Sequence, residues 1–330
     1  MKSEGVRVLL ATGGSGGHIY PALAVAGELE RRGAEAVFVG QARGMEARLV
    51  GETPYAFYGV RAGKWDRTKP DPRQAWQAVM GVGDAYRIVK RLRPQVALGF
   101  GGFASFPGLA GALRSGVPFA LHEQNAFPGR VTRWLQGRAR LIATAQAEVH
   151  ARLPRARRLE HVGMPIREIR VPRREARAQL GLAEDGKLAL VMGGSQGSLS
   201  LNRAVPAAYR GLPPEAREDL TVLHSSGPRW EDGLTEKVAD LPHYHVSGWV
   251  DSVLAWSAAD LAITRAGTGT LAEAAFHGVP LLMVPLPWAA EDHQTHNARA
   301  VAAAGAGRIV SERELGTLAA QWQALLDDRV

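Results

Sequence analysis

The chain has 330 residues, of which 46% are hydrophobic and 22% charged, and this size favours two globular domains that each bury a core. It contains no cysteine, which excludes a disulfide framework, a thiolate metal site and a cysteine nucleophile. The formal net charge of +8 is uneven: residues 1–165 carry 24 Lys and Arg against 12 Asp and Glu, and residues 166–330 carry 16 against 20. The basic first half favours an anionic partner, such as a phosphate compound, a nucleic acid or a membrane surface.

The N-terminal segment predicts the first strand of a cytoplasmic protein and no secretory signal. Glu4 precedes the apolar run of MKSEGVRVLL, and no small-residue cleavage site follows. Beyond it, short apolar runs alternate with helical patterns. The strands expected in the first half are Val6–Ala11, Ala36–Val39, Val96–Phe100, Phe119–His122 and Leu141–Ala143, and the clearest helices are Ile19–Arg32 and Arg73–Leu92.

The segment from Pro94 to Leu113 is long enough to cross a membrane, with 20 residues and no charge. It holds five glycines and two prolines, however, and it divides into the apolar run VALGF and a glycine-rich stretch. We therefore predict a buried strand, a loop and a short helix here instead of a membrane span.

The second half repeats the alternation of strands and helices. Its expected strands are Leu188–Met192, Leu220–Leu223, Leu261–Thr264 and Leu281–Val284, and its helices lie near Leu199–Ala208, Thr270–His277 and Gln294–Ala304. Strands that are apolar throughout and separated by helices are typical of parallel sheets covered on both faces. The predicted fold class is therefore α/β, with doubly wound parallel sheets.

A sequence pattern that occurs twice in the chain indicates two similar domains. VRVLLATGGSGG near the start and LALVMGGSQG at 188–197 each run from a buried strand into a glycine turn, and Gly13 and Gly193 lie 180 residues apart. We expect two Rossmann-like domains, residues 1–164 and 165–330, divided within VGMPIRE, where Pro165 limits the backbone. Ligands of such sheets lie beyond the carboxyl ends of the strands, so we expect the site in a cleft between the domains.

The first glycine loop, Gly13–His18, has the sequence GGSGGH and directly follows the first expected strand. Glycines allow a tight turn close to a ligand, and the next helix offers unpaired N–H groups to an anion. The loop lacks the Lys of a P-loop, and Ile19 stands where a dinucleotide fingerprint needs glycine. A plain tight turn is the alternative, although four glycines in five positions exceed what a turn requires. His18 could act as a base or as a hydrogen-bond donor.

Two loops of the second half suit phosphate in the same way. Gly193–Gly197 can bind a phosphate through its backbone N–H groups and the Ser195 hydroxyl. The stretch Thr264–Glu273 runs from a strand into small residues and a helix start, which forms another diphosphate cradle. Glu273 could accept two hydrogen bonds from a ribose diol or complete a capping box with Thr270, and the spacing does not decide between them.

Two polar runs leave more than one interpretation open. His122–Asn125 (HEQN) follows a strand and suits sugar or phosphate oxygens, with a surface loop as the alternative. His293 and His296 could share a helix face around a metal, but catalytic zinc needs three protein ligands and no third has convincing spacing. A helix start that presents Gln294 and Asn297 to a polyhydroxylated ligand fits this segment better.

These motifs, in this order, resemble the MurG family, the UDP-N-acetylglucosamine–N-acetylmuramyl-(pentapeptide) pyrophosphoryl-undecaprenol N-acetylglucosamine transferases. The match runs through GGSGGHIYPALAVA, FGGFASFPG, HEQNAFPGR, VGMPIR, GGSQGS, RAGTGTLAE and DHQTHNA and covers nearly the whole chain. The resemblance implies the GT-B fold and an inverting transfer of GlcNAc from UDP-GlcNAc to the 4-hydroxyl of the muramyl sugar of lipid I, which gives lipid II. One departure is the end at LLDDRV, where relatives continue into a closing helix; how the domains are tied together stays open.

The resemblance also implies which residues bind the substrates. In the first domain these are residues facing the donor sugar and the acceptor diphosphate, Ser15, Gly16 and Gly17, and the sugar-contacting Asn125. In the second domain they are the phosphate-binding Arg167 and Ser195, Val250 for the uracil edge and Gln294 for the sugar hydroxyls. Phosphate and ribose are held by the helix start Thr268, Gly269, Thr270, Leu271, Ala272 and Glu273.

An inverting displacement needs a base for the attacking hydroxyl and stabilisation of the departing UDP. We expect His18 to be the base, with Glu123 as a weaker candidate, and helix amino ends together with Arg167 to stabilise the leaving group. No Asp-x-Asp site stands at an expected strand end, which agrees with the metal-independent catalysis that is usual for enzymes of this fold. We therefore expect neither a metal nor another cofactor.

The polyprenyl chain of the acceptor implies peripheral association with the cytoplasmic face of an anionic membrane. Candidate docking residues on or before the helix Arg73–Leu92 are Trp65, Trp76, Val79, Met80 and Tyr86, with the cations Arg87, Lys90, Arg91 and Arg93. The same apolar spacing is typical of a helix that faces the core, which stays as the alternative.

Other functions explain less of the sequence. A GT-B transferase with a different acceptor, such as a diacylglycerol glucosyltransferase, is opposed by the HEQN and GGSQG strings. A nucleic-acid-binding protein would suit the pI of about 10.1 but leaves the glycine loops unexplained, and no helix-turn-helix or aromatic-basic sheet motif is apparent. A glycosidase would need two carboxylates facing one bond. The oligomeric state stays open.

Overall fold

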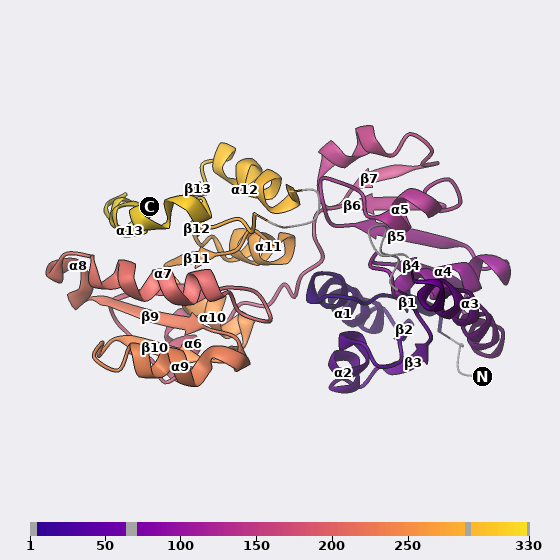
Figure 1. Cartoon of the computed structure of the whole chain (residues 1–330). Coiled ribbons are helices and arrows are strands. Elements are labelled where there is room, and N and C mark those ends of the chain that lie inside the picture. Colours follow the sequence, from indigo (N-terminus) through magenta and orange to yellow (C-terminus); the bar gives the residue numbers. More distant parts are fainter. Residues whose placement is uncertain (1–4, 64–70, 288–291, 329–330) are drawn as a thin grey trace. The chain divides into compact units, whose positions relative to one another are not determined.

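The computed structural model describes residues 5–63, 71–287 and 292–328. They form two compact units, Met1–Ile166 and Arg167–Val330, and each unit is built on one parallel sheet (Figure 1). The α/β class predicted from the sequence is confirmed in both units.

The first unit holds, among its described residues, a seven-stranded sheet in the order β3-β2-β1-β4-β5-β6-β7, with every neighbouring pair parallel. Its strands are β1 (Arg7–Ala11), β2 (Glu35–Gln41), β3 (Ala56–Val60), β4 (Val96–Gly99), β5 (Phe119–Glu123), β6 (Leu141–Thr144) and β7 (Leu159–His161). Its helices are α1 (Gly16–Arg31), α2 (Met45–Gly51), α3 (Pro72–Leu92), α4 (Ser105–Arg114), α5 (Arg130–Leu135) and the 3-10 helix η1 (Ala147–Arg152).

Both faces of this sheet are covered, because successive residues of a strand point to opposite faces. Leu9 and Ala11 of β1 pack in one hydrophobic cluster with residues of α3, α4 and α5. Val8 and Leu10 pack in another cluster with residues of α1 and α2. This two-sided burial explains why the central strands read as continuous apolar runs.

The second unit holds, in the part that the structure describes, a six-stranded parallel sheet in the order β10-β9-β8-β11-β12-β13. Its strands are β8 (Lys187–Met192), β9 (Leu220–Ser225), β10 (Tyr244–Ser247), β11 (Leu261–Thr264), β12 (Leu281–Met283) and β13 (Gly307–Ile309). Its helices are α6 (Arg173–Gln179), α7 (Leu199–Arg210), α8 (Pro214–Glu218), α9 (Glu231–Lys237), α10 (Ser252–Ala258), α11 (Thr268–His277), α12 (His293–Ala303) and α13 (Leu318–Asp327), with the 3-10 helices η2 (Pro228–Trp230) and η4 (Glu312–Thr317).

The same alternation builds the second core. Ala189 and Val191 of β8 face a cluster formed with α7, α9 and α13, whereas Leu188 and Leu190 face one formed with α6, α10, α11 and α12. In both units, therefore, helices cover the two faces of the sheet. The loops at the carboxyl ends of the central strands lie beyond the sheet, at the ends of these strands.

The segment from Pro94 to Leu113 forms a strand, a loop and a helix as predicted, in β4, residues 100–104 and α4. None of the described helices is both long and apolar enough to cross a bilayer. Four strands lie outside the predicted set: β3, β7, β10 and β13, which are the edge strands of the two sheets.

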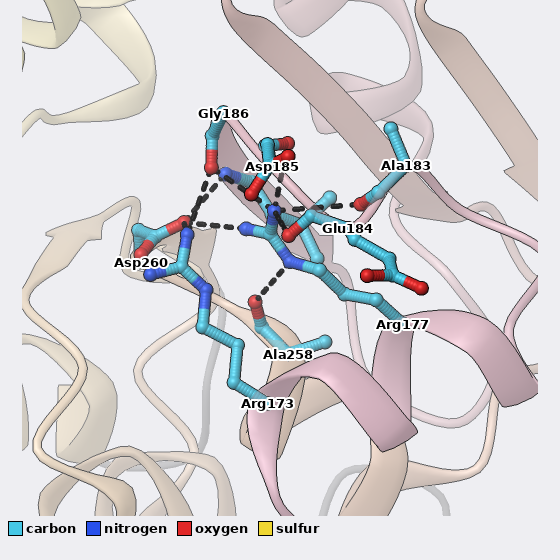
Figure 2. Close-up of polar contacts among 9 residues, drawn as sticks. Arg173, Arg177, Ala183, Glu184, Asp185, Gly186, Ala258 and Asp260 are labelled. Atoms are coloured by element: carbon cyan, nitrogen blue, oxygen red, sulfur yellow. Dashed lines mark hydrogen bonds and ion pairs between the residues drawn. The ribbon is translucent and has the colours of Figure 1, made fainter.

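A buried arginine connects segments at the amino ends of two central strands of the second sheet, β8 and β11. The Arg177 side chain on α6 is only 1% exposed, and its guanidinium donates to the Asp260 carboxylate at 2.7 Å (Figure 2). It also donates to the carbonyl oxygens of Glu184, Asp185 and Gly186, each at 3.0 Å. Asp260 accepts further bonds from Arg173 and from the backbone N–H of Leu188, at 2.8 and 2.7 Å. This network joins α6 to the turn before β8 and to the start of β11.

A buried histidine joins three elements of the same unit. The Nε2–H of His224, on β9, donates to Asn202 Oδ1 at 3.0 Å, and the Tyr244 hydroxyl donates to its Nδ1 at 2.7 Å. Asn202 in turn donates to the carbonyl of Ser226 at 3.0 Å. This pattern needs a neutral imidazole, and burial lowers the pKa of His224 to about 3.

We expect this histidine to make the second unit acid-sensitive. The unfolded chain binds a proton at His224 below about pH 6.5, whereas the folded state does so only near pH 3, so stability falls as the pH drops through this window. The contribution of this histidine to the loss is about 3 kcal/mol at pH 4 and about 5 kcal/mol below pH 3. Urea unfolding from pH 7 to pH 4 measures it, and His224→Gln should flatten the dependence. An equal slope in the variant would assign the acid sensitivity to other groups.

Candidate functional site

The first glycine loop lies at the carboxyl edge of the first sheet. It leaves β1 through Gly13 and Gly14, whose φ angles of 142° and 88° favour glycine, and α1 begins at Gly16 with Ser15 as its N-cap residue. The first backbone N–H groups of an α-helix have no acceptor within the helix. Gly16 and Gly17 therefore stand at a helix start, as the sequence predicts, and an arrangement of this kind suits an anion.

His18 is held against this loop by two contacts. Its Nδ1 lies 2.8 Å from Ser15 Oγ, and its carbonyl accepts a bond from Thr12 Oγ1 at 2.7 Å. Its ring packs on the loop after β4, where a Cβ added to Gly101 would lie 3.1 Å from His18 Cδ2. The structure therefore brings Ser15, Gly16, Gly17 and His18 together beside the β4 loop.

The HEQN run, whose first two residues end β5, mainly holds the loops around this strand end. Gln124 donates to the Phe100 carbonyl at 2.7 Å, and His122, whose pKa is lowered by burial, donates through Nε2 to the Gly163 carbonyl at 3.0 Å. Both side chains are buried, whereas Asn125 is partly exposed. Within the run, then, only the Asn125 side chain is partly exposed, while the other three are buried and hold the surrounding backbone.

Glu123 is poorly placed to act as a base. Its buried carboxylate accepts bonds from the backbone N–H groups of Asn125 and Gly129, at 3.2 and 3.0 Å, and from Thr132 Oγ1 at 2.6 Å. Burial raises the pKa of Glu123, which these three donors oppose. The carboxylate organises the loop that leads into α5, so His18 is the better candidate.

A cavity of about 630 Å³ opens in the second unit where three helices begin. Gly193, Gly194 and Gly197 of the second glycine loop line it, with Ser198 as the N-cap residue of α7. Gly267, the N-cap residue of α11, and Gln294, in the first turn of α12, line it as well. Three helix amino ends at one cavity create a strong preference for an anion.

Arg265 supplies a cation to this cavity and fixes its walls. Its guanidinium donates to Ser198 Oγ at 3.1 Å and to the Val284 carbonyl at 3.0 Å, and it also bonds Ser200 and Glu312. The second glycine loop, the end of β12 and η4 are thereby joined. The cavity is also lined by Arg203, Ser200 and Glu312, to which no motif of the sequence points.

Gln294 connects two of the loops around the cavity. Its Oε1 accepts bonds from the backbone N–H groups of Ala266 and Leu286, at 3.2 and 3.0 Å. The side-chain amide is thereby oriented, with the Nε2 group on the side away from these two donors. Ser195 is exposed on the second glycine loop, beside the cavity-lining Gly194.

Arg167, Val250 and the first turns of α11 meet in a second cluster. Arg167 donates to Ser252 Oγ at 3.1 Å, and Ser252 donates to Glu273 at 3.2 Å. The other oxygen of Glu273 accepts a bond from Trp256 Nε1 at 3.0 Å. Val250 is buried two residues before Ser252.

The structure excludes one of the two interpretations of Glu273, the capping box. Helix α11 begins at Thr268 with Gly267 as its N-cap residue and has no side-chain cap, so the capping box with Thr270 is wrong. Burial raises the pKa of Glu273, and the nearby charge of Arg167 acts in the opposite direction. Thr268, Gly269, Thr270, Leu271 and Ala272 form the first turn of α11 before it.

His293 and His296 both lie in the first turn of α12. Within the described residues, no group of three or more His, Cys, Asp or Glu side chains could hold a metal ion.

Two family models match the chain. The model of the glycosyltransferase family 28 N-terminal domain matches residues 8–144, and that of the glycosyltransferase family 28 C-terminal domain matches residues 188–329. Together they cover most of both units.

Named relatives and solved structures agree with these models. The chain is 50% identical, over 93% of its length and 87% of the relative, to the UDP-N-acetylglucosamine--N-acetylmuramyl-(pentapeptide) pyrophosphoryl-undecaprenol N-acetylglucosamine transferase of Deinococcus deserti. It is 45% identical to the protein of the same name from Thermus thermophilus, over 90% of this chain and 86% of the relative. The crystal structure of Acinetobacter baumannii MurG superimposes with a TM-score of 0.73 at 28% identity, covering 98% of this chain and 91% of that one. The kitacinnamycin glycotransferase, at 18% identity and a TM-score of 0.70, shows the fold alone.

Proposed function

The chain belongs to glycosyltransferase family 28 and, within it, to the MurG family, and we infer that it transfers N-acetylglucosamine from UDP-GlcNAc to lipid I, forming lipid II for peptidoglycan synthesis. The observation that carries this inference is the 50% identity over 93% of the chain to a relative of that name. The GT-B fold expected from the sequence, with its two parallel α/β units, agrees with it.

The reaction is a single displacement at the anomeric carbon. The 4-hydroxyl oxygen of the muramyl sugar forms a bond to C1 of GlcNAc while the bond from C1 to the β-phosphate oxygen of UDP breaks. The bonding electrons leave with UDP, the hydroxyl proton passes to a base, and the configuration at C1 inverts. The protein must therefore hold that base and stabilise the growing charge on the diphosphate.

We assign the base to His18. His18 Nδ1 lies 2.8 Å from Ser15 Oγ. We assign the proton to Nδ1, as a donor to this hydroxyl, which leaves the lone pair of the ring on Nε2 to accept the hydroxyl proton. The contact with the Ser15 hydroxyl holds the ring in its orientation. The N–H groups of Gly16 and Gly17 would bind the acceptor diphosphate and the donor sugar beside it, with Asn125 as a sugar contact.

We assign the departing UDP to the cavity of the second unit. The amino ends of α7, α11 and α12 supply backbone N–H groups, with Ser195 and residues Thr268–Ala272 at the phosphates. Arg167 adds a positive charge near Glu273, which we propose for the ribose. The backbone of Val250 would read the uracil, and the oriented amide of Gln294 the sugar hydroxyls.

Nucleotide recognition can be tested without the lipid. A ligand at 100 times its Kd adds about 2.7 kcal/mol of stability to the folded state, enough to raise the Tm of the unit that binds it. We expect UDP-GlcNAc to raise the Tm, and GDP- and TDP-sugars at the same concentration to leave it unchanged. Equal stabilisation by a GDP- or TDP-sugar would contradict the assignment of the donor.

We also propose that the first unit docks on the cytoplasmic face of an anionic membrane through the amino-terminal half of α3. The carboxyl-terminal half of α3 faces the core through the buried Ala85 and Val89, so the core-facing alternative holds for that half. Trp76 and Val79 are instead 65% and 64% exposed. Among the other candidates, Met80 and Tyr86 are half-buried, the cations Arg87, Lys90, Arg91 and Arg93 are exposed, and Trp65 lies outside the described residues.

Replacing Trp76 with Ser should weaken binding to vesicles that contain phosphatidylglycerol by about tenfold, because one large apolar contact is lost. Binding of the wild type should also fall with added salt. Cosedimentation measures both effects. Trp249→Ser is the matched control, since Trp249 is 62% exposed but lies in the second unit. Equal binding of Trp76→Ser and the wild type would contradict this docking surface.

A further inference from the structure

A buried carboxylate lies behind the first glycine loop. Glu46, in the first turn of α2, is 0% exposed. Its Oε2 accepts a bond from the backbone N–H of Gly14 at 3.2 Å, and its Oε1 accepts one from the backbone N–H of Gln41 at 2.8 Å. Gly14 follows β1 and Gln41 ends β2, so one carboxylate joins the exits of two neighbouring strands.

Three glycines make room for this carboxylate. A Cβ added to Gly13 would lie 2.2 Å from Glu46 Oε1, and one added to Gly44 would lie 2.5 Å from Oε2. A Cβ added to Gly40 would lie 2.7 Å from Glu46 Cγ. Real Cβ atoms do not approach other atoms so closely, so Glu46 crowds all three positions. At Gly40 the Thr12 carbonyl oxygen lies equally close, at 2.7 Å, and at Gly13 the φ of 142° favours glycine as well. Gly13 therefore packs against the carboxylate, while Gly16 and Gly17 form the start of α1.

The carboxylate also sets the backbone that carries the reacting groups. It holds Gly13 and Gly14 at positive φ, immediately before Ser15, whose hydroxyl contacts His18 Nδ1. The carbonyl of Gly13 packs on Gly102, where a Cβ would lie 2.0 Å from that oxygen and 3.3 Å from His18 Nδ1. A shift of Gly13 or Gly14 would therefore move both Ser15 and the surface on which the imidazole rests.

We propose that Glu46 is a positioning residue for the transfer reaction: it fixes the first glycine loop so that Ser15 and His18 meet the acceptor hydroxyl. This inference rests on the function proposed above. Glu46 is 0% exposed and so out of reach of a bound substrate, and the cavity that we assign to the nucleotide lies in the other unit. The contribution of Glu46 should thus be visible in kcat and not in the KM for UDP-GlcNAc.

Two substitutions test the inference in different ways. Glu46→Gln keeps the size of the side chain but has one acceptor oxygen, so its NH₂ group would face one of the two backbone N–H groups. Gly44→Ala leaves Glu46 in place and crowds its carboxylate, and the φ of −85° at Gly44 is one that alanine adopts freely. We expect each variant to lose between about tenfold and 100-fold in kcat, with the KM for UDP-GlcNAc within about twofold of the wild type.

Gly51→Ala is the matched control, because it changes the same helix at a position where an added Cβ meets nothing within 4 Å. It should keep the wild-type kcat. Amide hydrogen exchange of Gly14 gives a readout that needs no turnover, and we expect it to be faster in Glu46→Gln. Wild-type kcat in both test variants, or unchanged exchange at Gly14, would overturn the positioning role. An inactive wild type would instead count against the proposed function, and the exchange measurement would still decide the role of Glu46.

Discussion

Replacing His18 with alanine should lower kcat for lipid II formation by about 10²- to 10⁴-fold, the usual contribution of a positioned general base. The KM for UDP-GlcNAc should stay within about twofold, because the cavity that we assign to the nucleotide is lined by residues of the second unit. The pH dependence of kcat that a titrating base imposes should also disappear. Steady-state kinetics across pH on the wild type and the variant measure all three effects.

Two further variants separate the base from its surroundings. Ser15→Ala removes only the partner of Nδ1, so its loss in kcat should be smaller than that of His18→Ala. His161→Ala is the control: this histidine of β7 is exposed and contacts the Ala145 carbonyl. Near-normal kcat in His18→Ala, with an unchanged pH profile, would end the assignment of His18 as the base.

Replacing Arg177 with methionine should destabilise the second unit by about 3–5 kcal/mol, the usual cost of removing one partner of a buried ion pair. The variant would leave the carbonyls of Glu184, Asp185 and Gly186 without this donor (Figure 2). At about 2–4 °C for each kcal/mol, the Tm should fall by roughly 6–20 °C. Thermal and urea unfolding of the full chain, followed by circular dichroism, measure the loss.

Arg174→Met provides the comparison, because Arg174 is an exposed residue of the same helix. It should change stability by less than about 0.5 kcal/mol. If the two variants had the same Tm, the network around Arg177 would not be what stabilises this edge of the second sheet.

The sequence predicts the central strands well because they are buried on both faces. Such strands read as continuous apolar runs, and the predicted Leu261–Thr264 coincides with β11. The edge strands β3, β7, β10 and β13 escape prediction because each pairs on one side only and carries exposed residues within a short span. Their mixed composition resembles that of loops.

The glycine loops were predictable for a related reason. Each follows a buried strand and opens a helix, so local sequence alone places Gly13–His18 and Gly193–Gly197 at the carboxyl edges of the two sheets. The family resemblance then added the substrates, which spacing could not supply.

Hydrogen bonds between residues that are far apart in the sequence could not be predicted from it. Glu46 lies 32 residues from Gly14, and Glu312 lies 47 residues from Arg265, so neither pairing leaves a local pattern. The polar run at His122–Asn125 shows the opposite error, because residue type alone does not tell a side chain that binds a ligand from one that holds a loop. The structure shows that Gln124 and Glu123 bond to the backbone of neighbouring loops, at Phe100 and Gly129.

The central claim is tested most directly by single-turnover transfer from UDP-GlcNAc to a short-chain lipid I analogue, with the linkage of the product read by NMR. The account predicts one UDP released for each product and a new β-linkage between C1 of GlcNAc and the 4-oxygen of the muramyl sugar. Release of UDP and free GlcNAc without coupling, or attachment at another hydroxyl, would contradict it.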